Sequence, residues 1–374
     1  MCSPAFSHNH IKEMVPTMAI PAQTLGKIWE GRVDASENGS VEFNVALTVP
    51  GNEVSQAYHQ LLTGVSLTTL MLRLYVPFYV DVPFKHNRIR KQSIQIIEQV
   101  TAKIIQKKRA RILADKEDSE DGKDLMSILI RANEQIGTLD DGRLTDTELK
   151  AQIMTFIGAG HETTAVTVTW MLHIFSTHPD VQRKVRQEML RNIGLPTEDN
   201  KCPLSYDALN ALPYLNACVK ELLRFIPPVP NTSRVATHDD KILGYDIPKG
   251  THIVLSAAAW HKLKSVYGED AEEFKPERWM DPSSFSEEEQ KSIKFVTPDM
   301  TWAYIPFLTR PRNCIGSKFA TIGVKILLYY LLMNLEYAPV PGFKFKKSPR
   351  FVMRPDPGMR LIVKRFQHDT HVTY

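Results

Sequence analysis

The sequence has few cysteines, and none of them forms a paired motif. The four cysteines in 374 residues are Cys2, Cys202, Cys218 and Cys314, with no C-x-x-C spacing and no histidine at zinc-finger spacing. Neither a disulfide scaffold nor a structural zinc site is therefore indicated. This cysteine usage fits a reducing compartment best.

The sequence also has no strong excess of charge of either sign. It carries 46 Lys and Arg against 42 Asp and Glu, a net charge of +4, and these charges are dispersed along the chain. Nucleic-acid binding usually requires a concentrated basic patch, so this balance argues against a nucleic-acid partner.

Long uninterrupted apolar runs are missing as well. The segment up to Trp29 has no unbroken apolar h-region, so we expect no signal peptide. The most hydrophobic stretch is Leu61 to Phe84, and it is interrupted by Arg73, Pro77, Asp81 and Pro83. These interruptions exclude a clean transmembrane helix there.

Helical patterns dominate what is present, and 43% hydrophobic residues suffice for a substantial core. Apolar residues at helical spacing predict a helix over Arg88–Leu113, and another begins near Asp124. Shorter helices are predicted over Asp180–Asn192 and Pro213–Phe225, the second stopped by two prolines. The first 52 residues show no sustained period, and we assign no element there.

A capping box, Thr145-x-x-Glu148, predicts the start of a helix at Asp146 that continues to Thr177. Such a helix is far longer than the usual mean of about 11–12 residues. It contains Gly158 and Gly160, each of which costs roughly 1 kcal/mol in a helix interior and therefore needs a reason.

Strand patterns are fewer. Lys241 to Leu255 is typical of a small hairpin sheet, and Phe351 to Arg365 alternates weakly around an Asp-Pro-Gly turn. The predicted fold class is thus mainly α with a small β part.

Cys314 is a candidate metal ligand or nucleophile, because it lies in a Pro- and Gly-containing loop directly before an apolar helical run. Free backbone N–H groups and the positive end of the next helix favour thiolate over thiol. The alternative for a lone cysteine is inert burial.

Lys318, Lys325 and Arg310 could form a basic docking face near Cys314, although a solvated helix face explains them equally well.

Three further patterns carry chemistry. Glu162 and Thr163 follow Gly160 in the long helix; a zinc-binding H-E-x-x-H motif fails because residue 165 is Ala. The alternative for this segment is a Thr-rich kink in a core helix.

Glu221 and Arg224 share a helix face, usually as a surface ion pair worth about 0.3–0.5 kcal/mol. Arg234 follows a Pro-rich stretch, where a solvated arginine is the ordinary interpretation.

The spacing Phe-x-x-x-x-Arg-x-Cys-x-Gly, formed by Phe307, Arg312, Cys314 and Gly316, resembles the haem-binding loop of the cytochrome P-450 superfamily. The resemblance is to eukaryotic microsomal, fungal-like members. It implies that Cys314 is the axial haem ligand, that Phe307 packs beside its sulfur, that Arg312 faces a propionate, and that Gly316 lets the helix approach the porphyrin. Arg310 stands where the family usually has glycine, so we expect the loop to shift or the side chain to turn outward.

The other patterns match the same family in its order along the chain. The resemblance implies that Thr163 and Glu162 are catalytic, as oxygen-binding hydroxyl and proton-relay acid, and that Ala159 and Gly160 lie against the haem face. Arg234 would reach a haem propionate. The resemblance also makes a structural triad of three residues: Glu221, Arg224 and Arg278, the last in Pro276-Glu277-Arg278-Trp279.

The resemblance implies a haem-thiolate monooxygenase with haem b as cofactor, which inserts one oxygen atom of O2 into a small lipophilic substrate. Electrons would come from NADPH through a cytochrome P-450 reductase. It also implies a cytosol-facing endoplasmic reticulum membrane location, a role in secondary metabolism and peripheral membrane contact through residues 61–84.

Residues 1–374 are expected to form a single catalytic domain that lacks the family's N-terminal anchor and first helices and strands. The alternative is a non-catalytic truncated remnant that does not retain haem. A third interpretation, a cysteine nucleophile, lacks a histidine positioned as its base.

Overall fold

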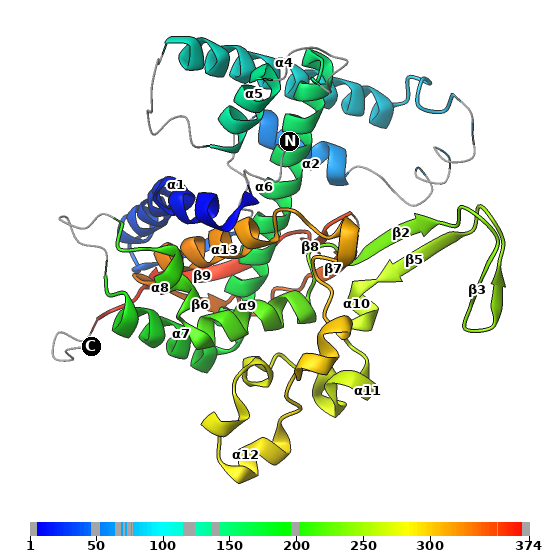
Figure 1. Cartoon of the computed structure of the whole chain (residues 1–374). Coiled ribbons are helices and arrows are strands. Elements are labelled where there is room, and N and C mark those ends of the chain that lie inside the picture. The colour runs from blue at the N-terminus through cyan, green and yellow to red at the C-terminus, as the bar shows by residue number, and fades with distance from the viewer. Residues whose placement is uncertain are drawn as a thin grey trace.

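The computed structural model describes residues 6–45, 53–63, 69, 72, 76, 78–114, 124–135, 143–195, 202–349 and 351–368. Helices make up most of this part, with small antiparallel sheets beside them, so the predicted fold class is confirmed (Figure 1). Part of the 61–84 stretch falls outside the described residues.

The long helix α6 (Asp146–Thr177) passes through the middle of the molecule, as Figure 1 shows. Both bonds of the predicted capping box form: the Thr145 hydroxyl accepts from the Glu148 N–H, and the Glu148 carboxylate accepts from the Thr145 N–H. The C-terminal half of α6 is almost entirely buried, with Trp170 fully inside the main hydrophobic core. This helix therefore provides the axis around which the other elements pack.

Further predicted helices are confirmed with small shifts of their ends. They are α4 (Lys85–Ala114), α5 (Leu125–Gln135), α7 (Pro179–Asn192) and α9 (Pro213–Phe225). Helices α4 and α5 lie at one end of α6 together with α2 (Glu53–Thr63), whereas α7 and α9 lie toward the other end (Figure 1). The short α-helices are α8 (Tyr206–Asn210), α10 (Ala257–Trp260), α11 (Lys264–Tyr267) and α12 (Glu287–Ser292).

Helix α1 (His8–Asp34) was not predicted, because Pro16 and Pro21 interrupt its pattern. Its buried face packs on α13 (Ser317–Leu332), the helix that follows Cys314. A Cβ atom on Gly26 would lie 2.9 Å from the carbonyl oxygen of Tyr330, so only glycine allows this close approach. Tertiary packing thus stabilises a helix that its own sequence pattern does not signal.

The sheets are small and antiparallel. Their strands are β1 (Ser40–Asn44), β9 (Arg360–Arg365) and β6 (Leu335–Pro339) in one sheet, β2 (Asn231–Val235) with β5 (His252–Ser256), β3 (Asp240–Ile242) with β4 (Tyr245–Ile247), and β7 (Lys346–Pro349) with β8 (Met353–Asp356). Strands were correctly predicted over the C-terminal segment.

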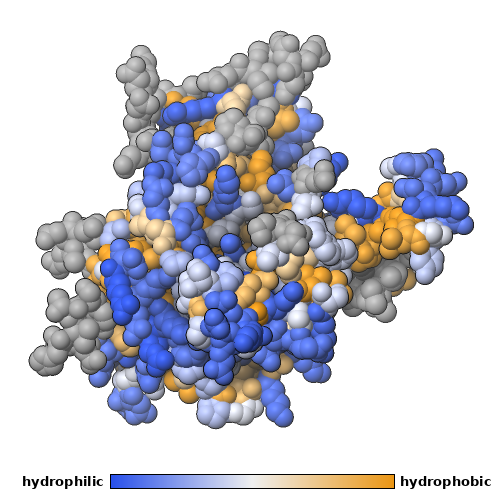
Figure 2. Space-filling model, turned by 60° about the horizontal axis from the view of Figure 1, so that its bottom comes forward, coloured by the Kyte–Doolittle hydropathy of each residue, from blue (hydrophilic) through white to orange (hydrophobic). Residues whose placement is uncertain are grey.

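The predicted hairpin between Lys241 and Leu255 is confirmed only in its first part. Strands β3 and β4 pair across Leu243 and Gly244, both with positive φ, but β5 pairs with β2 instead. These strands form the arm that projects from the molecule in Figure 1, and Figure 2 shows apolar residues gathered on it. The exposed hydrophobic residues of the arm include Val235, Ile242, Leu243, Tyr245, Val254 and Leu255.

None of the helices among the described residues combines the length and the hydrophobicity that spanning a membrane requires.

Candidate functional site

Cys314 lies between the short 3-10 helix η7 (Arg310–Arg312) and the first turn of α13. Its N–H donates to the carbonyl of Phe307 over 2.8 Å, which closes the loop, and Leu308 within the loop has φ +61°. The side chain of Cys314 is exposed, whereas Cys218 is fully buried and burial raises the pKa of its thiol. The alternative of inert burial is thus wrong for Cys314, and it describes Cys218 instead.

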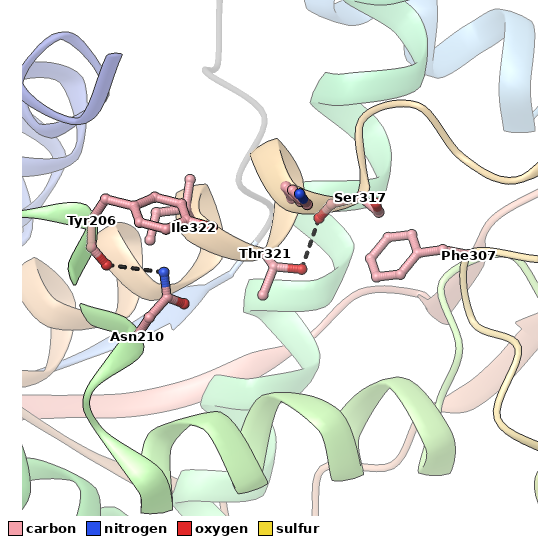
Figure 3. Close-up of a pocket in the computed structure, with 7 residues that line it drawn as sticks. Tyr206, Asn210, Phe307, Ser317, Thr321 and Ile322 are labelled. Carbon is pink, nitrogen blue, oxygen red and sulfur yellow. Dashed lines mark hydrogen bonds between the residues drawn. The ribbon is translucent and has the colours of Figure 1, made fainter. Parts of the chain in front are cut away.

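Phe307 and the start of α13 border a pocket of about 240 Å³ whose other side is α8 (Figure 3). The residues that line it are Tyr206, Asn210, Phe307, Ser317, Lys318, Thr321 and Ile322. The Thr321 hydroxyl donates to the Ser317 carbonyl, and the Asn210 amide donates to the Tyr206 carbonyl. The first of these hydrogen bonds lies within α13 and the second within α8.

Gly316 is the N-cap residue of α13. A Cβ atom at this position would lie 3.9 Å from the Cys314 sulfur and 3.7 Å from the ring of Phe6, which are ordinary contact distances. The protein atoms alone therefore leave room for a side chain at Gly316. The reason for glycine at this position must come from something other than this packing.

The two glycines in α6 have different surroundings. A Cβ atom on Gly158 would lie 2.8 Å from the ring of Tyr58 on α2, and the Tyr58 hydroxyl donates to the Met154 carbonyl over 2.8 Å. Gly158 therefore permits the contact between α2 and α6. A Cβ atom on Gly160 would meet no atom within 4 Å, so Gly160, next to exposed Ala159, borders open space.

Thr163 and Glu162 lie in the same turn of α6 but use different partners. The Thr163 hydroxyl donates to the Ala159 carbonyl over 2.7 Å. The Glu162 side chain is 2% exposed; its Oε2 contacts the guanidinium of Arg354 on β8, while its Oε1 is buried without a hydrogen-bond partner in the described residues. Burial and the charge of Arg354 lower the pKa of His161 next to it. No spacing pattern along the chain had pointed to Arg354.

Glu221, Arg224 and Arg278 meet in a buried cluster, and each of them is 0% exposed. The two carboxylate oxygens of Glu221 accept from Arg224 over 2.8 Å each, and one of them accepts from Arg278 over 3.0 Å. Trp279 also donates to Glu221. The pattern's ordinary interpretation as a surface ion pair is therefore wrong.

The remaining donors of the two arginines go to backbone carbonyls. Arg224 donates to His261, Ala271 and Glu273 over 2.7–2.9 Å, and Arg278 donates to Tyr267, Asp270 and Lys294 over 3.2–3.4 Å. A buried ionic cluster with all its donors used is costly to break, because removal of one member leaves an uncompensated charge. The cluster thus joins α9 to the irregular segment that follows α10.

Arg234 and Arg312 are exposed, and neither forms an ion pair within the described part of the chain. Arg234 donates to the Thr232 hydroxyl and the Ser233 carbonyl, both on its own strand. Both guanidinium groups are thus available to an anionic group. The expectation for the side chain of Arg310 lies outside the described side chains.

Lys325 does not belong to an exposed basic face. Its side chain is 2% exposed, and its ammonium donates to the Asn210 side-chain oxygen over 2.6 Å. Burial lowers the pKa of Lys325 to about 8, with a smaller effect from the charge of Lys220. Both sequence interpretations, a docking face and a solvated helix face, are therefore wrong for this residue.

The fold and the order of these motifs define a haem-thiolate class of protein, and comparison with known proteins agrees. The family model for cytochrome P-450 matches residues 2–363, so the chain belongs to the cytochrome P-450 family. It is 34% identical to the cytochrome P-450 monooxygenase sphH of Aspergillus fumigatus over 81% of the chain, and 31% identical to the cytochrome P-450 monooxygenase 205 of Postia placenta over 94%. A third relative, secologanin synthase 2 of Catharanthus roseus, is 28% identical over 98% of the chain.

The chain spans only part of these relatives. It covers 52% of the Aspergillus protein, 71% of the Postia protein and 69% of the Catharanthus protein. Family membership implies a haem cofactor.

The described residues fit such a cofactor. They contain no cluster of three or more metal-ligating side chains, but they do offer an exposed thiol, open space beside Gly160 and two exposed arginines without acidic partners. A single thiolate ligand and two cationic side chains for anionic propionates are the groups that would hold such a cofactor.

Proposed function

We propose that this chain is the catalytic part of a monooxygenase that inserts one oxygen atom of O2 into a small lipophilic organic substrate. The single observation that carries the proposal is the exposed thiol of Cys314, held in a closed loop at the start of α13, in a chain of the cytochrome P-450 family. The haem would supply the oxygen-activating chemistry, which a cysteine thiolate promotes by electron donation.

In this proposal Cys314 is the metal ligand, and the cofactor-binding residues around it hold the haem. The carbonyl of Phe307 accepts the Cys314 N–H, which orients the cysteine backbone. Arg312 and Arg234 bind the propionates through charge-assisted hydrogen bonds. Gly316 and Gly160, with Ala159, leave the surfaces of α13 and α6 free of bulky side chains.

Thr163 and Glu162 are the proposed catalytic residues on the oxygen side. The Thr163 hydroxyl already donates its proton to the Ala159 carbonyl, so its oxygen lone pairs are free to accept a hydrogen bond. Glu162 offers its unpartnered Oε1 as the atom that holds and releases a proton, while Arg354 contacts Oε2. Exclusion of bulk water from this carboxylate, which is 2% exposed, supports a directed proton transfer.

The proposal is tested by adding haem to the purified chain, reducing it and exposing it to carbon monoxide. We expect the absorption band typical of thiolate-ligated haem. Cys314→Ser removes this band, whereas Cys218→Ser retains it, because Cys218 lies in the core away from solvent. A histidine-type spectrum from the wild-type chain contradicts the assignment. Failure to bind haem supports the alternative of a non-catalytic remnant.

Electrons in this proposal come from NADPH through a cytochrome P-450 reductase. With haem bound and reductase present, Thr163→Ala is expected to consume NADPH while forming less product, because the hydroxyl no longer orients the proton path. NADPH consumption and product are measured together. Unchanged product per NADPH contradicts the role of Thr163.

We also propose that the chain contacts the cytosolic face of the endoplasmic reticulum membrane peripherally. A role in secondary metabolism is part of the same proposal. Support comes from the exposed apolar side chains between α2 and α4, which are Leu72, Val76, Phe78, Val80, Val82 and Phe84. The Phe78 residue is 79% exposed, and its backbone has a positive φ of +60°. In a flotation experiment, the wild-type chain should rise with phospholipid vesicles, whereas the double variant Phe78→Ser, Phe84→Ser should not. If both proteins float to the same extent, the proposed membrane contact is contradicted.

A further inference from the structure

His261 lies between the buried ionic cluster and the cysteine loop. It follows α10 directly and is 0% exposed. Its carbonyl accepts from Arg224 over 2.9 Å, and its imidazole Nε2 accepts the backbone N–H of Ile305 over 2.9 Å. The ring also stacks on Tyr304, with centroids 5.6 Å apart and planes at 28°. One residue thus contacts both the cluster and the segment that leads to Cys314.

Backbone hydrogen bonds continue from Ile305 to Cys314. The Ile305 carbonyl accepts the N–H of Leu308 over 3.1 Å, and the Phe307 carbonyl accepts the N–H of Cys314 over 2.8 Å. Leu308 has φ +61°, a conformation that is unfavourable for a side chain of this size and persists only when its surroundings fix it. Anchoring Ile305 therefore helps to fix the loop.

The protonation state of His261 suits this contact. A backbone N–H can only donate, so Nε2 must carry a lone pair and the ring proton must be on Nδ1. Nδ1 is buried and has no hydrogen-bond partner among the described residues. Burial, and then the charge of Arg224, lower the pKa of His261 to about 4, so the imidazole stays neutral near pH 7.

We propose that His261 is a positioning residue that couples the Glu221–Arg224–Arg278 cluster to the cysteine loop by accepting the Ile305 N–H. The backbone of His261 is fixed by Arg224, and its imidazole transmits this position to the loop. The inference rests on the proposed role of Cys314 as haem ligand for its functional meaning, but the coupling itself is a property of the chain without cofactor.

Amide hydrogen exchange of the haem-free chain tests the coupling. His261→Leu removes the acceptor, and we expect exchange at Ile305 and across residues 305–314 to accelerate by about threefold to tenfold, the effect of losing one hydrogen bond. His261→Gln keeps an oxygen acceptor and should restore much of the protection. His173→Leu is the matched control, since it removes a partly buried imidazole of α6 that packs on Trp170 and Phe345.

The segment in which amide exchange accelerates in His261→Leu decides between a specific coupling and a general packing role. Faster exchange confined to residues 305–314 in His261→Leu, with α6 unchanged, supports the proposal. Equal acceleration in α6, or no change in the loop, overturns it, because either result gives His261 only a general packing role.

The carbon monoxide spectrum separates this inference from the proposed function. If the wild-type chain binds haem through thiolate, His261→Leu should convert part of the band to the form without thiolate, while His173→Leu should not. If the wild-type chain shows no thiolate band, the proposed function fails, but the exchange result on the haem-free chain still decides the role of His261.

Discussion

Buried Glu162 in the middle of α6 and partly buried Arg354 on β8 form an ion pair between residues 192 positions apart. Strand β8 is tied to α6 a second time, because the Trp170 indole donates to the Met353 carbonyl over 2.7 Å. The Met353 N–H in turn donates to the Pro228 carbonyl over 2.8 Å. These contacts fix the strand that presents Arg354 to the carboxylate.

Arg354→Met is expected to destabilise the chain by about 3 kcal/mol, because it leaves the Glu162 charge buried without compensation. Urea unfolding of the haem-free chain measures this loss. Glu162→Gln combined with Arg354→Met should cost less than the sum of the two single changes, since the double variant buries no unpaired charge. If the loss in the double variant equals the sum of the two single losses, the two side chains do not interact and the ion pair is contradicted.

Alanine substitutions at the two glycines of α6 should have opposite effects. Gly158→Ala places a Cβ atom 2.8 Å from the Tyr58 ring and should lower the free energy of unfolding by about 1–3 kcal/mol. Gly160→Ala meets open space and should raise it by about 0.5–1 kcal/mol through helix propensity. Thermal unfolding of the haem-free chain measures both.

Haem binding adds a second measurement at Gly160. If Gly160 lies against the cofactor, Gly160→Ala stabilises the haem-free chain and at the same time weakens haem binding. A variant that is more stable and binds haem as well as the wild type contradicts the cofactor-binding role of Gly160.

The stability of the chain should fall as pH drops from about 6.5 toward 4, in part because of His261. Burial holds the folded pKa at about 4, so the unfolded chain binds a proton that the folded chain cannot accept in this window. The effect of this residue alone amounts to about 3 kcal/mol at pH 4. The charge of Arg224 also lowers the pKa of His261, the charge of Glu221 raises it by less, and Tyr304 stacks on the ring.

Urea unfolding at pH 7 and at pH 4.5 measures this dependence. His261→Gln removes the titrating group, so its loss of stability between the two pH values should be smaller than that of the wild type. The same dependence in both proteins contradicts the shifted pKa of His261.

Lys325→Met should stabilise the chain at pH 7, because the variant no longer buries an ammonium group. The folded pKa of Lys325 is about 8, below the value of about 10.4 for an unfolded chain, so the wild type gains stability as pH rises through this range. Unfolding at pH 7 and pH 10 should show a gain for Lys325→Met that is largest at pH 7. A loss of stability at pH 7 means that the bond to Asn210 outweighs the burial cost.

Much of the helical framework could be predicted, since its signals are local. The capping box of Thr145 and Glu148 fixed the start of α6, and the prolines after Phe225 fixed the end of α9. Helix α1 was missed, because its prolines obscure the pattern and its stability comes from α13. The pairing of β5 with β2 was also missed, since strand partners are chosen by three-dimensional packing.

The residues of the candidate site also fall into those that could be predicted and those that were missed. Its residues were found because they occur at fixed spacings within short segments, and their catalytic and cofactor-binding roles stay predictions. Arg354 and His261 were missed, because a single Arg or His carries no spacing signal. Their partners, Glu162 and Ile305, are distant in the sequence.

The sequence by itself determined the family motifs, the long helix and the position of Cys314 before α13. Tertiary structure alone decided that Cys314 is exposed while Cys218 is buried, that Glu221 joins a closed ionic cluster, and that Lys325 is enclosed. The physical reason is that burial depends on which surfaces meet when distant segments pack, and free energies of desolvation are set by that packing.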